Sequence, residues 1–89
     1  MAHCPPELLD DLAPVLAEVR TWPGVVERSP GVFYLRRQPF VHFHLLKGGR
    51  CGDVKGHDWA RFDLPQPISA ARRRSFLRAL RTRYGEKAR

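Results

Sequence analysis

The chain lacks the short motifs that identify most nucleotide-binding proteins and hydrolases. It contains no GxGxxG or GxxxxGK(S/T) phosphate loop, no GxSxG nucleophile turn and no HExxH metal motif. Its two cysteines, Cys4 and Cys51, are too few for a disulfide framework and form no paired CxxC motif. We therefore expect free thiols in a reducing cytoplasm, no cofactor, and a protein that is not an enzyme.

Long apolar runs are missing as well. No stretch approaches the roughly 18 consecutive apolar residues of a membrane-spanning helix, and residues 1–6 lack the basic and apolar regions of a secretory signal. We expect neither a membrane partner nor export. The length of 89 residues allows one hydrophobic core, which predicts a single domain over residues 1–89 with frayed ends at 1–5 and 86–89.

Helical periodicity is present near both ends of the chain. Residues 6–20 carry apolar side chains at helical spacing, but Pro14 would interrupt one continuous helix. Either the helix covers all of 6–20, or residues 6–10 form a separate turn and Asp11 caps a helix with Pro14 in its first turn. Both arrangements agree with the pattern.

The second helical segment follows Pro67. Ser69 is a suitable N-cap, and Gly85 is expected to end the helix. The apolar stripe between them consists of Phe76, Leu77, Leu80 and Tyr84. This stripe predicts a helix that packs on a sheet.

Between the helical segments the apolar residues alternate with a period of two, which is typical of half-buried strands. Short turns make neighbouring strands antiparallel, so the expected fold is a two-layer α+β domain: a four-stranded meander with an N-terminal and a C-terminal helix on one face. The expected strands are 32–36, 40–46, 50–55 and 59–64, with a further short strand at 25–28.

The expected register follows from turns at 37–39, Gly48-Gly49 and 56–58. It places Lys47 opposite Arg50, Leu46 opposite Cys51, His44 opposite Asp53 and His42 opposite Lys55. One face then carries Phe33, Leu35, Val41, Phe43, Leu45, Val54, Phe62 and Leu64. The other carries Tyr34, Arg36, His42, His44, Cys51, Asp53, Lys55, Trp59, Arg61 and Asp63.

The polar side of this sheet is the leading candidate site. A dense set of hydrogen-bonding and aromatic groups on one face favours a non-enzymatic module that binds a small ligand or a partner protein. An ordinary solvated sheet face explains the same pattern. The candidate binding residues are Tyr34, His42, His44, Asp53, Lys55, Trp59 and Arg61.

Metal binding and catalysis at this face are weaker hypotheses. His42 and His44 have the spacing to share a zinc ion, but Lys55 opposite His42 would place an ammonium beside the metal. A His44–Asp53 pair could orient a general base, with Cys51 as nucleophile. Against this, Cys51 opposite Leu46 would lie away from His44. We therefore expect no metal site and no catalytic residue.

The net charge of +7 is concentrated at one end of the chain. Residues 68–89 hold eight of the 16 basic residues and one of the nine acidic residues. Arg74, Arg78 and Arg81 fall on one side of the predicted helix, where they could contact nucleic-acid phosphates. Weak nucleic-acid binding through this helix is the alternative function, although a charged solvent face needs no such partner.

Several segments resemble a family of small uncharacterised bacterial proteins. The pattern consists of Trp22-Pro23-Gly24-Val25, Gly31-Val32-Phe33-Tyr34, residues 39–44 (Pro-Phe-Val-His-Phe-His), Asp53-Val54-Lys55 and an arginine-rich helix ending in Arg83-Tyr84. The resemblance covers residues 15–84 and implies a bacterial, cytoplasmic protein, without assigning any catalytic residue. The order helix, meander, helix is also similar to frataxin-like and YjbR-like domains, a likeness of fold alone.

Overall fold

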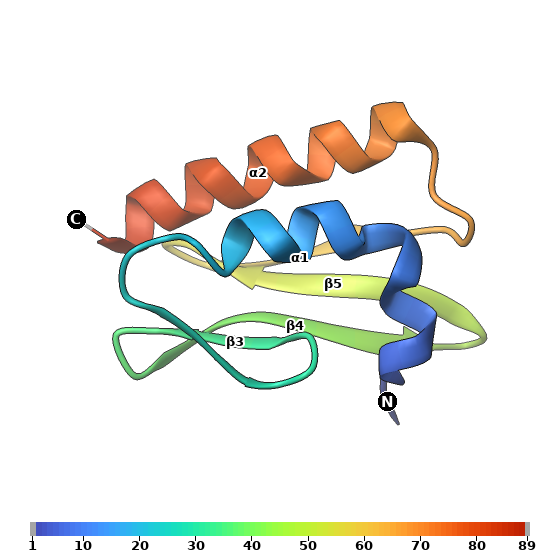
Figure 1. The fold of residues 1–89 in the computed structure, drawn as a ribbon, viewed down its shortest axis with the longest axis horizontal. Helices are drawn as coiled ribbons and strands as arrows, with labels where there is room; N and C mark the ends of the chain where they lie inside the picture. Colours follow the sequence, from blue (N-terminus) through green and yellow to red (C-terminus); the bar gives the residue numbers. More distant parts are fainter. Residues whose placement is uncertain (1, 89) are drawn as a thin grey trace.

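Both helices lie on the same face of an antiparallel sheet (Figure 1). The computed structural model describes residues 2–88. Its elements are, in order, β1 (Ala2–His3), the 3-10 helix η1 (Pro6–Leu12), α1 (Ala13–Val19), β2 (Val25–Ser29), β3 (Val32–Leu35), β4 (Gln38–Leu46), β5 (Gly49–Lys55), β6 (Trp59–Asp63) and α2 (Ala70–Ala88). The α+β class and the meander are confirmed.

The sheet has one more strand in its meander than the four predicted. Its strand order is β2-β3-β4-β5-β6, and β2 occupies the place of the further short strand expected at 25–28. In addition, β1 pairs with β4, with His3 opposite His44. The Cys4 N–H donates to the Phe43 carbonyl at 3.1 Å, and the Cys4 side chain is buried. Residues 2–4, which we expected to fray, are thus tied to the sheet.

The core lies between the sheet and the two helices. All eight residues assigned to the apolar face belong to it or pack against it. Phe40 also turns inward, although alternation would place it beside His42, because the β3–β4 pairing shifts between Phe33 and Tyr34. The largest fully buried apolar side chains are Phe33, Phe40, Leu12, Leu35, Leu64, Leu80, Val15, Val19, Val41 and Val54.

The N-terminal segment adopts the second of the two predicted arrangements. The 3-10 helix η1 precedes α1, and Pro14 lies in the first turn of α1, where no backbone N–H is needed. The predicted cap is wrong. Leu12 precedes α1 and makes no capping hydrogen bond, whereas the Asp11 carboxylate accepts hydrogen bonds from Arg50 and from the Ile68 N–H.

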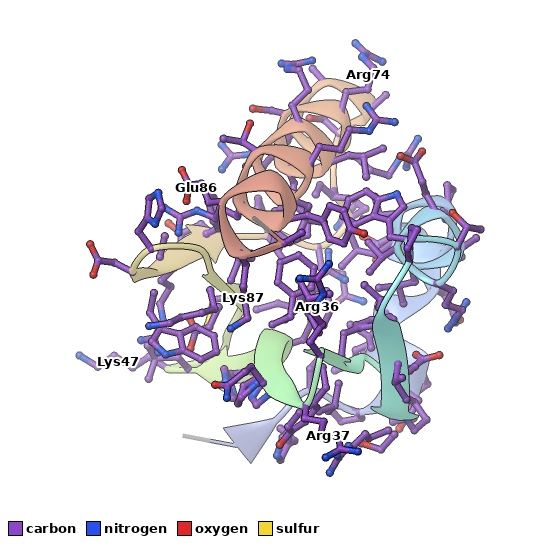
Figure 2. The ribbon with its side chains drawn as sticks, turned by 90° about the vertical axis from the view of Figure 1, so that its left-hand side faces the viewer. Arg36, Arg37, Lys47, Arg74, Glu86 and Lys87 are labelled. Atoms are coloured by element: carbon purple, nitrogen blue, oxygen red, sulfur yellow. The ribbon has the colours of Figure 1, made fainter. Side chains whose placement is uncertain are left out.

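The start of α2 is confirmed and its predicted end is wrong. Ser69 Oγ accepts a hydrogen bond from the Arg72 N–H at 3.1 Å, as expected of an N-cap. The helix continues through Gly85 to Ala88. Tertiary contacts hold this last turn: Arg36 rises toward it (Figure 2) and donates to the Ala88 carbonyl at 3.0 Å. Packing here overrides the weak helix preference of glycine.

The register across β4 and β5 differs from the prediction by two residues. The turn residues are Lys47 and Gly48, with φ of 52° and 77°, and Leu46 pairs with Gly49. Two central residues with positive φ are typical of a type I′ hairpin, which suits the twist of the strands. The observed pairs are His42 with Asp53, His44 with Cys51 and Leu45 with Arg50.

The other two predicted turns had different outcomes. The β3–β4 turn consists of Arg36 and Arg37, both with positive φ, instead of residues 37–39, so Arg36 leaves the strand face. The turn at 56–58 is confirmed, with Lys55 opposite Trp59. Since the β4–β5 shift is an even number of residues, it moves no residue of these two strands to the other face.

Candidate functional site

The sheet face away from the helices, here called the polar face, is open (Figure 1). Within residues 2–88 no helix lies on this side, and Val26 and Trp59 are 58% and 48% exposed. Strand alternation places the predicted binding residues here, together with two from β2 that the prediction omitted, Val26 and Arg28. The polar face is therefore accessible to a ligand.

Three rings form a line across the polar face, which we call the aromatic row: Tyr34, His42 and Trp59. The His42 ring centroid lies 6.1 Å from that of Tyr34 and 5.9 Å from that of Trp59. Both distances are within the range of aromatic contact. Tyr34 belongs to β3, His42 to β4 and Trp59 to β6, so only the folded sheet brings the rings together.

A cation lies against each end of the aromatic row. The Arg28 guanidinium carbon is 4.3 Å from the Tyr34 centroid, and Lys55 Nζ is 5.8 Å from that of Trp59. Both distances fit cation–π contact. With Arg28 on β2 and Lys55 on β5, the five side chains come from five different strands.

His42 is the packing centre of the aromatic row. Its Nε2 is buried and, among the described residues, has no hydrogen-bond partner. Burial lowers the pKa of His42, and the nearby His44 and His3 lower it further. The imidazole is therefore neutral at pH 7, a state that suits a ring packed between Tyr34 and Trp59.

Asp53 neutralises the cation beside it. The Arg61 guanidinium donates to both carboxylate oxygens, at 2.8 and 3.0 Å, and these hydrogen bonds hold the pKa of Asp53 below its usual range. His44 Nε2 lies 3.4 Å from Asp53 Oδ2. The expected His44–Asp53 pair thus forms diagonally, while the strand neighbours of Asp53 are His42 and Arg61.

His3 joins the two predicted histidines. Its ring centroid lies 5.6 Å from that of His44 and 6.4 Å from that of His42. This contact was not predictable from the residue pattern, because β1 has only two residues and no alternation of its own. Among residues 2–88, no group of three or more His, Cys, Asp or Glu side chains is arranged to hold a metal ion. The predicted pairing of Lys55 with His42, which would have placed an ammonium beside a metal, is wrong, because Asp53 lies opposite His42.

Cys51 lies closer to His44 than predicted. The two residues are strand partners, so the expected pairing of Cys51 with Leu46 is wrong. The Cys51 side chain is nevertheless buried, and burial raises the pKa of its thiol. A buried thiol with a raised pKa is a poor nucleophile.

The aromatic row lies outside four cavities in the protein surface. Four surface cavities of about 180 to 310 Å³ open elsewhere, and none of these four is lined by Tyr34, His42 or Trp59. One lies beside His3 and Cys4, and another between β6 and α2. Rings that none of these cavities encloses suit an extended chain better than a small enclosed ligand.

The three arginines of the alternative hypothesis differ in their surroundings. Arg81 Nε donates to Glu18 of α1 at 2.9 Å, so part of its charge is neutralised. Arg74 projects from the outer side of α2 (Figure 2). Within residues 2–88, the side chains of Arg74 and Arg78 make neither a hydrogen bond nor an ion pair. Of these three arginines, only Arg74 and Arg78 therefore keep an unneutralised charge within residues 2–88.

Comparison with known proteins adds no function. No known protein family, no curated protein sequence and no solved structure matches the chain. The resemblance to small bacterial proteins therefore stays a prediction. Of the helices in residues 2–88, none has the length and apolar character needed to cross a membrane.

Proposed function

We propose that the protein is a non-enzymatic binding module that contacts its ligand or partner through the polar face. One observation carries the proposal: five strands each contribute one side chain to a continuous line, Arg28, Tyr34, His42, Trp59 and Lys55. In a face that is only solvated, nothing requires aromatic rings from different strands to pack against one another. Exposed aromatic and arginine side chains are characteristic of binding surfaces.

The pairing of the strands supports the same proposal. Tyr34 and Trp59 are placed on either side of His42 by paired strands, so a ligand would meet a surface that is already formed. A preformed surface avoids much of the entropy cost of ordering side chains on binding. Catalysis is less well supported, because the Cys51 thiol is buried with a raised pKa.

Backbone amide and indole NMR shifts will test this function. The probes are nucleoside monophosphates, a glutamate-rich peptide and a single-stranded oligonucleotide of about ten nucleotides. We expect at least one probe to shift the Trp59 indole together with the amides of Tyr34, His42, Asp53 and Lys55. Shifts confined to α2, or no shifts with any of the probes, would contradict the proposal.

A further inference from the structure

We propose that the occupant of the polar face is single-stranded nucleic acid, with bases stacked on the aromatic row and phosphates bound by the cations at its ends. This inference rests on the proposed function and names its ligand class. No aromatic and basic pattern is visible along the chain, because Arg28, Tyr34, His42, Lys55 and Trp59 are scattered over 32 positions. The sheet assembles that pattern in space.

Stacking area is available at both ends of the row. Trp59 is 48% exposed, and its indole is the largest ring on this face. At the other end Arg28 lies 4.3 Å over Tyr34, so a base there would meet a guanidinium plane backed by a ring. Bases of single strands stack on both aromatic rings and arginine planes. His42 packs between Tyr34 and Trp59 and holds these two rings in place, so it does not itself have to contact the ligand.

The charge beside the row favours an anionic chain. Asp53 is neutralised by two hydrogen bonds from Arg61, whereas within residues 2–88 the cations next to the rings, Arg28 and Lys55, make no ion pair. Arg37, in the β3–β4 turn, is exposed and points away from α2 (Figure 2). Cations flanking stacking rings give the combination that tracks a phosphate backbone.

The exposed Trp59 ring favours single strands over duplexes. No cavity among the four encloses the row, so an extended strand can lie along it. In a duplex the base faces are stacked on one another and are not free to stack on Tyr34 or Trp59. We therefore expect binding that tolerates base sequence but discriminates strongly against double strands.

Fluorescence anisotropy with labelled oligouridylate and oligothymidylate of about ten nucleotides tests the inference. We expect binding at low salt that weakens steeply toward physiological salt. Trp59→Ala should weaken it by about 5- to 100-fold, and Trp59→Phe, which keeps a ring, should restore most of the affinity. Trp59 is exposed, and circular dichroism will verify that both variants fold.

A matched pair of charge variants separates the polar face from α2. Lys55→Ala and Arg78→Ala each remove one positive charge, the first beside the row and the second on the outer face of the helix. We expect several-fold weaker binding for Lys55→Ala and less than about twofold for Arg78→Ala. Loss with Arg78→Ala but not with Trp59→Ala would overturn the inference and move the contact to α2.

Two further outcomes distinguish this inference from the proposed function. If a duplex of the same length binds as tightly as the single strand, the inference that bases stack on the aromatic row is wrong. If no oligonucleotide binds while the glutamate-rich peptide shifts the polar-face resonances, the ligand class is wrong and the binding face stands. If the oligonucleotides, the glutamate-rich peptide and the nucleoside monophosphates all fail to bind, both proposals are wrong.

Discussion

Arg50 shows how a single side chain can join segments that are distant in the sequence. Its side chain is 1% exposed, and its guanidinium donates to both carboxylate oxygens of Asp11, at 2.6 and 2.9 Å. It also donates to the carbonyls of Leu8, Leu64 and Pro65. The hydrogen bonds from Arg50 lower the pKa of Asp11. A buried guanidinium is tolerated only when its donors are satisfied in this way.

Removing the partner of Arg50 should be costly. Asp11→Ala leaves a buried cation without its carboxylate and should lower the free energy of unfolding by about 3 kcal/mol. Asp10→Ala is the matched control, because Asp10 is exposed and adjacent, and it should change stability by less than about 0.5 kcal/mol. Urea denaturation of both variants measures the difference. Equal stability of the two variants would show that the ion pair contributes little.

At the scale of elements, the β4–β5 hairpin decides which residues of the polar face are neighbours. Lys47 and Gly48 both have positive φ, a conformation that costs a lysine about 1 kcal/mol or more and a glycine almost nothing. The sequence Gly48-Gly49 suggested a turn one position later. The observed turn at Lys47 and Gly48 makes Asp53, instead of Lys55, the strand partner of His42.

This turn provides a test of the register. Lys47→Asn should stabilise the protein by about 0.5 to 1 kcal/mol, because asparagine tolerates the left-handed conformation and Asn-Gly is a favoured type I′ pair. Gly48→Ala should destabilise it by about 1 kcal/mol, although a Cβ there meets no atom within 4 Å, since only its φ of 77° is unfavourable. Thermal unfolding midpoints measure both effects. A loss of stability with Lys47→Asn would argue against this turn.

At the scale of the whole molecule, the polar face and the ion pairs make stability depend on pH in two stages. Burial lowers the pKa values of His42 and His44 below those of the unfolded chain. As pH falls through about 6.5, the unfolded chain takes up protons that the folded protein does not. The carboxylates of Asp11, Glu27 and Asp53 also have lowered pKa values, so their stabilisation is lost at more acidic pH.

We therefore expect the free energy of unfolding to be constant between about pH 7 and 8, to fall toward about pH 5.5, and to fall again below about pH 4. Urea denaturation across this range measures the profile. His42→Phe should reduce the first fall and leave the second unchanged, because the carboxylate pairs remain. A profile that is flat between about pH 7.5 and 5.5 would show that the histidines of the polar face are solvated.

Much of the architecture could be predicted from local pattern. Alternation with period two assigned Phe33 and Val54 to the core face and His42 to the polar face, and a two-residue error in register left those assignments intact. The Ser69 cap depended only on neighbouring backbone groups and was also predictable. Local signals failed for Gly85, where contacts of the last turn of α2 extend a helix that glycine would otherwise end.

The sequence by itself thus determined the α+β class and which side chains share a face, because both depend on the periodicity of neighbouring residues along one strand or helix. Only the tertiary structure decided which of those side chains touch. The turn at Lys47–Gly48 set the cross-strand partners, the pairing of β1 brought His3 to His44, and Arg50 was buried against Asp11. Contacts between strands depend on turn geometry and on segments far apart in the chain, which no local pattern encodes.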